Sequence, residues 1–286
     1  MIVSSFYKYV EINKLEEFQK EHQEYCKNLG IKGKILIANE GINGSISGTE
    51  DQIKEYELYL NNLDIFSDIK FKRTNSDVHP FRKIIVRIRK EIVTSNFDVN
   101  VKNTAKHLNP KELKKMLDNN EELIFLDARN DYESKIGKFK NAITPKIKTF
   151  KEFKNILPQL KVYKNKKIVM YCTGGVRCEK ASALLVEDGF KDVNQIDGGI
   201  FNFVQQYPDT YFEGRCFVFD DRLSISTGIN NSDISVCELC HFPCGRYINC
   251  TNKICDKLFI CCEECDLKSS HTCSKQCINK IKNATV

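Results

Sequence analysis

Two rhythms of apolar and polar residues alternate along the first third of the chain. Strand periodicity or short apolar runs occur in residues 2–10, 34–38, 45–47, 69–73 and 83–89. Helical spacing of apolar residues occurs in 13–29 and 49–60, and Asn13 and Thr49 are candidate N-caps because Glu16 and Gln52 stand three residues on. The order βαββαβ predicts a split βαβ, or ferredoxin-like, α+β domain, which we place at residues 1–95.

A second pattern begins at Asn109, where a candidate cap and a following proline open a helix. Residues 96–108 are polar with little periodicity, and we interpret them as a linker. Beyond them, apolar runs at 123–126, 167–171 and 193–196 alternate with helical spacing at 179–187 and 200–206. This alternation predicts an α/β domain with a parallel sheet over residues 109–212. The pattern then dissolves, and residues 213–286 form a cysteine-rich tail.

Composition narrows the class of protein. The chain has 286 residues, of which 41% are hydrophobic, enough for two or three domains with apolar cores. The net charge of +6 is mild; it permits a polyanionic partner without requiring one. Acidic residues at Glu11, Glu16 and Glu17 interrupt the apolar N-terminus, so we expect no signal peptide. No stretch approaches the roughly 18 apolar residues of a membrane span, and we expect a cytoplasmic protein without membrane contact.

The most distinctive chemistry is a thiol loop at the end of a predicted parallel strand. Cys172 ends the strand and Arg177 enters the next helix. The residues between them are Thr173, Gly174, Gly175 and Val176. The glycines let backbone N–H groups turn inward, and the helix N-terminus and Arg177 favour a thiolate on Cys172. The alternatives are an inert buried cysteine, or a phosphatase loop; a phosphatase would place five residues before the arginine, and here there are four.

Three neighbours of the loop have open roles. Cys178 could resolve an oxidised Cys172 as a disulfide, or it could be a small residue packed at a helix start. Asp127 and Arg129 follow the preceding predicted strand and would lie near the same sheet edge, where they either support the loop or form a structural pair.

The order of these motifs resembles a rhodanese domain. The matching residues are Asp127-x-Arg129, Glu133, the CTGGVRC loop and Asp197-Gly198-Gly199. With residues 37–44, 90–93, 172–181 and 217–222, essentially the whole chain resembles the rhodanese-domain tRNA uridine hydroxylase family. The resemblance implies oxygen-dependent 5-hydroxylation of the wobble uridine of tRNA, with Cys172 as the catalytic cysteine. The chain departs from the family in an extra Cys261 and in having no tryptophan.

The residues themselves support a thiol mechanism but do not specify hydroxylation. There is no G-x-G-x-x-G motif, and the five histidines do not suggest a 2-His-1-carboxylate site. We therefore expect no flavin, nicotinamide or haem site, and molecular oxygen would be a co-substrate. A sulfurtransferase with a persulfide on Cys172 is the alternative enzyme. A non-catalytic RNA-binding module is the alternative outside enzymes.

A basic segment is the candidate RNA-binding surface. Arg82, Lys83, Arg87 and Arg89 lie in or beside the last predicted strand of the first domain, with phenylalanines nearby. Basic and aromatic residues together suit single-stranded RNA such as the anticodon loop of tRNA, although an ordinary solvated sheet face has the same composition. The turn at residues 39–44 could contact substrate at the domain junction or be a plain hairpin turn.

Ten of the 14 cysteines lie in the tail between Cys237 and Cys277. In a reducing compartment, short Cys-x2-Cys spacings indicate metal ligands before disulfides, and we expect structural zinc, with disulfides, free thiols or an iron–sulfur cluster as alternatives. The expected ligands are Cys237, Cys240, Cys244, Cys250, Cys255, Cys262, Cys265, Cys273 and Cys277. Cys261, adjacent to Cys262, is the expected spare. Eight ligands would make two sites, but the spacing does not say which cysteine joins which.

Overall fold

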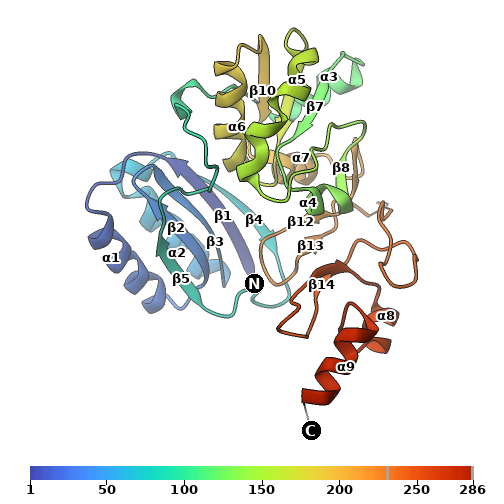
Figure 1. Cartoon of the computed structure of the whole chain (residues 1–286). Helices are drawn as coiled ribbons and strands as arrows, with labels where there is room; N and C mark the ends of the chain where they lie inside the picture. Colours follow the sequence, from blue (N-terminus) through green and yellow to red (C-terminus); the bar gives the residue numbers. More distant parts are fainter. Residues whose placement is uncertain (230–231, 285–286) are drawn as a thin grey trace. The chain divides into compact units, whose positions relative to one another are not determined.

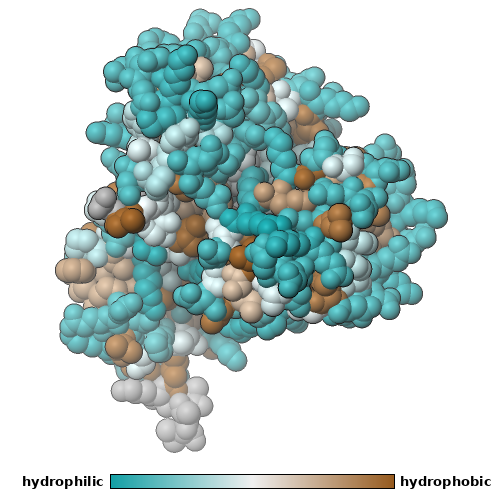
Figure 2. Space-filling model, turned by 180° about the vertical axis from the view of Figure 1, so that it is seen from behind, coloured by the Kyte–Doolittle hydropathy of each residue, from teal (hydrophilic) through white to brown (hydrophobic). Residues whose placement is uncertain are grey.

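A computed structural model describes residues 1–229 and 232–284 of the chain. It divides into two compact units (Figure 1): residues 1–130 with 143–203, and residues 131–142 with the described residues from 204 on. Among the described helices, none combines the length and apolarity that crossing a membrane would need. One face of the molecule, drawn in Figure 2, is mostly hydrophilic, with apolar residues scattered in small groups.

The first unit begins with a five-stranded sheet, ordered β4-β1-β3-β2-β5. Its elements are β1 (Ile2–Tyr9), α1 (Leu15–Asn28), β2 (Lys32–Ala38), β3 (Gly41–Gly48), α2 (Glu50–Asn61), the 3-10 helix η1 (Asp64–Phe66), β4 (Lys70–Asn75) and β5 (Ile84–Ile88). The predicted ferredoxin-like arrangement is therefore present, and β5 extends it by pairing parallel to β2. Phe6, Ile35, Ile42 and Ile46 form the core with the apolar faces of α1 and α2.

The two predicted helix caps of this domain have different outcomes. Thr49 forms a capping box with Gln52, as expected. The prediction for Asn13 is wrong, because α1 has Lys14 at its N-cap, with φ 52° and no capping hydrogen bond from a side chain. Ile12 explains this difference: it is buried and its N–H donates to the Asn39 carbonyl at 3.1 Å. That anchor fixes the direction from which the chain enters α1.

The second part of this unit is a four-stranded parallel sheet, ordered β6-β10-β9-β7. Its elements are η2 (Val101–Asn103), β6 (Lys106–Leu108), α3 (Pro110–Asp118), β7 (Ile124–Asp127), η3 (Phe150–Ile156), α5 (Leu157–Leu160), η4 (Lys161–Tyr163), β9 (Lys167–Tyr171), α6 (Val176–Glu187), β10 (Asp192–Ile196) and α7 (Gly199–Gln206). The predicted parallel sheet is confirmed. The expected linker, 96–108, ends in strand β6, which hydrogen bonds to β10.

The α6 helix packs on the parallel sheet directly behind the thiol loop. Cys178, Ala181 and Leu185 of α6 join Ile168 and Met170 of β9 in one apolar cluster. The helix begins at Val176, three residues before the predicted start. Gly175, at its N-cap, has φ 104°, a conformation that glycine adopts without strain, and this allows the chain to enter the helix immediately after the loop.

The second unit has short elements and little regular sheet. They are α4 (Asp131–Ile136), β8 (Gly137–Phe139), β11 (Phe212–Gly214), β12 (Cys216–Phe217), β13 (Ser224–Ile225), β14 (Tyr247–Asn249), β15 (Leu258–Ile260), α8 (Glu263–Lys268) and α9 (Lys275–Ala284). The strands form antiparallel pairs, β8 with β11, β12 with β13, and β14 with β15. The apolar cluster of this unit includes Ile136, Phe217, Tyr247 and Phe259, together with several of the tail's cysteines.

Candidate active site and metal centres

Cys172 lies immediately after the last residue of β9, with 1% of its surface exposed. The Gly175 N–H donates to its Sγ at 3.1 Å. Burial alone would raise the pKa of this thiol. It is outweighed by hydrogen bonding from Cys178, the charge of Arg177, and the backbone N–H groups of Arg177 and Gly175, which lower the pKa to about 5. Cys172 is therefore a thiolate at neutral pH, as the loop sequence predicts.

The start of α7 fixes the backbone of the thiol loop. The Ile200 N–H donates to the Cys172 carbonyl at 2.9 Å, and the Phe201 N–H donates to the Thr173 carbonyl at 3.1 Å. Gly199 has φ 71°, and a Cβ there would lie 2.5 Å from the Cys172 carbonyl oxygen. Only glycine permits this approach, which explains why a diglycine follows Asp197 in the sequence.

Cys178 contacts the reactive sulfur from the first turn of α6. Its side chain is fully buried and hydrogen bonds to Cys172. Burial, followed by the hydrogen bond and the charge of Cys172, holds the pKa of Cys178 well above its ordinary value. These opposite shifts in pKa favour the negative charge on Cys172 and the proton on Cys178.

Two residues of the N-terminal sheet lie against the thiol loop. Lys72 of β4 donates to the Gly174 carbonyl with Nζ at 2.6 Å, and this Nζ is 4.9 Å from the centre of the Tyr7 ring. Burial lowers the pKa of Lys72 to about 8, with the negative charge of Cys172 opposing that change. Lys72 belongs to the basic segment seen in the sequence, but the sequence connects neither residue with Cys172, because the fold brings them together from 100 and 165 residues away.

A buried carboxylate lies next to this contact. Glu179 of α6 accepts hydrogen bonds from the Tyr7 hydroxyl at 2.7 Å and from Thr104 Oγ1 at 2.8 Å. His107 Nε2 is 2.9 Å from the same carboxylate, and Gln195 Nε2 is 3.1 Å away. Burial would raise the pKa of Glu179, but the bond with His107 and its charge, with the other donors, lower it. Glu179 is thus ionised and joins both halves of the first unit.

The turn at residues 39–44 also lies at this junction. Lys180, with 5% of its side chain exposed, forms ion pairs with Glu40 at 2.9 Å and with Glu91 at 2.8 Å. Glu40 also accepts a hydrogen bond from the Ile92 N–H at 2.8 Å. The turn therefore connects the N-terminal sheet to α6, a role beyond that of a plain hairpin.

Asp127 and Arg129 pair with each other at the end of β7. Both side chains are fully buried, and Arg129 Nη2 is 2.6 Å from Asp127 Oδ2. The guanidinium carbon of Arg129 lies 5.6 Å from the centre of the Tyr171 ring, in the strand that leads to Cys172. The geometry favours the structural pair among the two roles predicted for these residues.

The predicted basic residues are solvent-exposed. Arg82, Lys83, Arg87 and Arg89 are all exposed, in or beside β5, which is the edge strand next to β2. The neighbouring Val86 is buried in the core. In β5, the exposed Arg87 lies between the buried Val86 and the partly buried Ile88, so the cationic groups are accessible to a polyanion.

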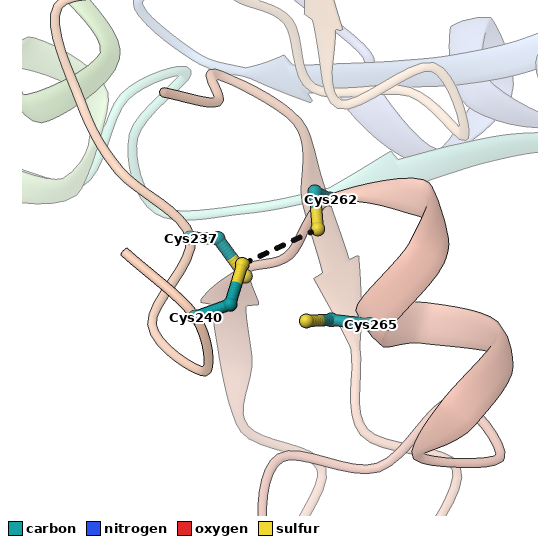
Figure 3. A group of neighbouring side chains, drawn as sticks. All are labelled: Cys237, Cys240, Cys262 and Cys265. Atoms are coloured by element: carbon teal, nitrogen blue, oxygen red, sulfur yellow. Dashed lines mark hydrogen bonds between the residues drawn. The ribbon is translucent and has the colours of Figure 1, made fainter. Parts of the chain in front are cut away.

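Eight tail cysteines converge into two groups of four. One group is Cys237, Cys240, Cys262 and Cys265, and the other is Cys250, Cys255, Cys273 and Cys277. Figure 3 shows the first group, in which two cysteines from a loop face two from the start of α8. Along the chain, cysteine pairs alternate between the groups, so the two sites interleave. This alternation is a long-range arrangement that spacing alone could not assign.

Two other cysteines between Cys237 and Cys277 lie outside both groups in the part of the chain that the structure describes. Cys261 was the expected spare and is fully buried. Cys244 was expected to be a ligand, but it packs in the apolar cluster and its sulfur accepts a hydrogen bond from the Arg246 N–H at 3.4 Å. The nine expected ligands are thereby reduced to eight.

The sulfur separations fit a tetrahedral metal site. Cys240 and Cys262 Sγ are 3.7 Å apart in the first group. In the second, Cys273 Sγ is 3.6 Å from Cys255 Sγ and 3.8 Å from Cys277 Sγ. Four sulfurs around zinc, with Zn–S bonds of about 2.3 Å, would be about 3.8 Å apart. Both groups therefore have the donor type and the size of a four-cysteine zinc site.

Family models match three consecutive parts of the chain. Residues 1–92 match the UPF0176 acylphosphatase like domain, residues 109–206 match the rhodanese-like domain, and residues 213–278 match the rhodanase C-terminal family. The predicted division into an α+β domain, a rhodanese domain and a cysteine-rich segment agrees with these three matches.

Related proteins resemble the chain over nearly its whole length. A tRNA uridine(34) hydroxylase of Bacillus cytotoxicus is 42% identical over 281 residues, which cover 95% of this chain and 86% of the relative. The protein of the same name from Cytophaga hutchinsonii is 39% identical over 275 residues, 95% of this chain and 88% of the relative. With the thiol loop and all three domains present, the chain belongs to the tRNA uridine(34) hydroxylase family.

Proposed function

We propose that this protein hydroxylates C5 of uridine 34 in tRNA, with molecular oxygen as co-substrate and Cys172 as the nucleophile. The observation that carries the proposal is the intact thiol loop within a chain that is about 40% identical, nearly end to end, to proteins named tRNA uridine(34) hydroxylase. A tRNA substrate would place the protein's work in the cytoplasm.

The chemistry of uracil suits a thiolate nucleophile. The C5–C6 double bond is conjugated with the C4 carbonyl, so a thiolate adds at C6 and leaves C5 electron-rich. C5 can then form a bond to oxygen, which uracil alone does not do readily. The low pKa of Cys172 supports this role, because the sulfur is already ionised at neutral pH and is also a good leaving group when the C6–S bond breaks.

The rest of the thiol loop would hold this sulfur in place. The Gly175 N–H at 3.1 Å and the Arg177 N–H favour the thiolate, and the charge of Arg177 stabilises it. Thr173, Gly174 and Val176 would contribute through the loop backbone, which α7 and Lys72 hold at Thr173 and Gly174. Arg177 is thus part of the catalytic site in this proposal.

The basic residues of β5 would bind the RNA backbone near the anticodon loop. Arg82, Lys83, Arg87 and Arg89 are exposed cations, and phosphate contacts are the main source of affinity in protein–nucleic acid complexes. Their place on the same compact unit as Cys172 supports an interaction that presents position 34 to the thiol loop.

Zinc would occupy both four-cysteine groups and stabilise the tail. Sulfur separations of 3.6–3.8 Å match a tetrahedral site, and the described cysteines of each group lie within 4.8 Å of one another. When bound, zinc would supply folding free energy to short elements that bury little apolar surface. Neither group is assigned a part in the reaction.

Nucleoside analysis of tRNA from cells lacking the gene tests the proposal. We expect 5-hydroxyuridine-derived nucleosides at position 34 to disappear, to return with the wild-type gene, and to stay absent with Cys172→Ser. A rhodanese loop also suits sulfur transfer, so thiouridine must be measured in the same samples. Loss of thiouridine with 5-hydroxyuridine unchanged would replace this proposal with a persulfide sulfurtransferase.

A further inference from the structure

The thiol loop contains two sulfurs. Cys172 and Cys178 are both free, both buried in the same apolar cluster, and hydrogen bonded to each other. The one other cysteine of the first unit, Cys26, is buried apart from this pair in the core of the N-terminal domain. A pair of adjacent thiols is a two-electron reductant, because its oxidation to a disulfide releases two electrons and two protons.

The proposed hydroxylation needs a two-electron donor. One atom of O2 enters the product and the other becomes water, which requires two electrons and two protons beyond those of uridine. Molecular oxygen is the oxidant in the proposed function, and the donor of these two electrons has still to be identified.

We propose that Cys172 and Cys178 form the reducing dithiol of the reaction, so that each turnover ends with a Cys172–Cys178 disulfide and an external thiol reductant restores it. This inference rests on the proposed function. The balance is uridine + O2 + two thiols → 5-hydroxyuridine + water + one disulfide.

The proposed reaction has five steps, and in each one the bonds formed and broken balance. Cys172 sulfur bonds to C6, and C5 then bonds to O2 and gains a proton on the distal oxygen, giving a C5 hydroperoxide. Cys178 sulfur attacks that distal oxygen, which breaks the O–O bond, leaves a hydroxyl on C5, and makes Cys178 a sulfenic acid. Loss of the C5 proton and of the C6–S bond releases 5-hydroxyuridine. The Cys172 thiolate then attacks the Cys178 sulfenic acid, and hydroxide leaves as water.

The environment of Cys178 suits the thiol that reduces the peroxide better than the thiolate that adds to C6. Its thiol stays protonated at neutral pH, since burial and the charge of Cys172 raise its pKa, and it can deliver a proton to the developing peroxide. Cys178 is fully buried, and Lys72 and Tyr7 of the N-terminal sheet lie against the loop that contains Cys172. Because Cys178 hydrogen bonds to Cys172 within one apolar cluster, a sulfenic acid formed there would lie next to the Cys172 thiolate.

A single-turnover experiment with the full-length, zinc-loaded protein tests the inference. The reduced protein is freed of reductant under nitrogen, mixed with an excess of a tRNA transcript containing uridine 34, exposed to air, and quenched with acidic N-ethylmaleimide. Mass spectrometry counts 5-hydroxyuridine and the oxidation state of each cysteine. We expect equal amounts of product and of Cys172–Cys178 disulfide, with further product only after dithiothreitol is added.

Variants separate the second thiol from the fold. Cys178→Ser and Cys178→Ala should each lower product in the reductant-free reaction at least tenfold, while Cys26→Ala, another buried cysteine replacement, should behave as wild type. Thermal melting checks that the variants are folded. Product formed while both thiols stay alkylatable would overturn the inference and leave the hydroxylase intact. Absence of 5-hydroxyuridine even with excess dithiothreitol would overturn the proposed function, and the inference with it.

Discussion

The thiol loop and the cysteine-rich tail use the same side chain for opposite purposes. The fold around Cys172 consists of a parallel sheet and an apolar cluster and does not depend on cysteine ligands. Backbone N–H groups of this fold keep the Cys172 sulfur ionised. In the tail, eight cysteines form two groups of four that could each bind a metal ion, and the nearby strands have only two or three residues. In the first region the fold keeps a cysteine ionised for reaction. In the second region the cysteines, by binding metal, would stabilise the fold.

This difference shows what makes a cysteine reactive in a chain that has 14 of them. A thiolate stabilised by hydrogen bonds keeps its lone pairs available for a carbon or oxygen electrophile. A thiolate bound to zinc has given a lone pair to the metal and is held in a tetrahedral site. Replacing a cysteine should therefore affect mainly activity in the first region and mainly folding in the second.

The largest effect should come from Cys172→Ser. The replacement hardly changes volume, but a serine hydroxyl is not ionised at neutral pH, so activity should fall by about 10³-fold or more. Activity on a tRNA transcript, measured as 5-hydroxyuridine by mass spectrometry, checks this. Cys26→Ala serves as the control for replacing a buried cysteine, and retention of activity in Cys172→Ser would remove the thiol mechanism.

Loss of metal should unfold the tail, with a smaller effect on the thiol loop. Cys237→Ser or Cys250→Ser removes one ligand from one site; because the sites interleave, we expect both to weaken. Structural zinc contributes roughly 10 kcal/mol or more of apparent binding free energy, which short strands cannot replace. Elemental analysis and limited proteolysis measure the result. Cys244→Ser is the matched control, and two zinc ions should remain in it; one lost ion there would mean that Cys244 is a ligand.

Local features of the sequence anticipated the thiol loop correctly, because strand, loop and helix are contiguous. The glycines, Arg177 and Cys178 act within seven residues of Cys172, and their effect follows from local backbone geometry. The same is true of the Thr49 cap. The Asn13 cap was predicted by an equally local rule and failed, because the distant contact of Ile12 with Asn39 decides where α1 begins.

Contacts between residues far apart in the chain could not be predicted from the sequence pattern. Tyr7 and Lys72 meet the thiol loop only because the two sheets pack together, and nothing in their neighbouring residues indicates this. The pairing of tail cysteines depends on how the chain crosses between the two sites, and the spacing of Cys244 looked as suitable as that of any ligand. Composition predicted a metal-binding tail but not its connectivity.

Lys72→Gln sharpens the comparison from within the first unit. It removes a positive charge near the Cys172 thiolate, so the pKa of Cys172 should rise above its value of about 5. Thiolate absorbance at 240 nm, taken as the difference from Cys172→Ser, rises as pH increases through this pKa. Activity should fall about tenfold, with partial recovery in Lys72→Arg. Lys70→Gln removes a cation that pairs with Asp197 instead and is the control; an unchanged titration in Lys72→Gln would contradict the assignment.

The smallest effect should come from the exposed cations of β5. Arg87→Gln removes one phosphate-binding charge, so tRNA affinity should fall about two- to five-fold, and the dependence of log Kd on log salt should flatten by less than one unit. Filter binding at several salt concentrations measures both. Lys138→Gln, on the short β8 strand of the second unit, is a same-charge control. Equal losses from both variants would point to net charge rather than to β5.

The most direct test of the account is the fate of labelled oxygen. Full-length protein, a uridine-34 tRNA transcript, dithiothreitol and ¹⁸O2 are incubated together, with parallel reactions under nitrogen and with Cys172→Ser. The account predicts one ¹⁸O atom in each 5-hydroxyuridine, and no product without oxygen or without the thiol. Thiouridine that forms under nitrogen and depends on a persulfide donor, or 5-hydroxyuridine whose oxygen comes from water, would contradict it.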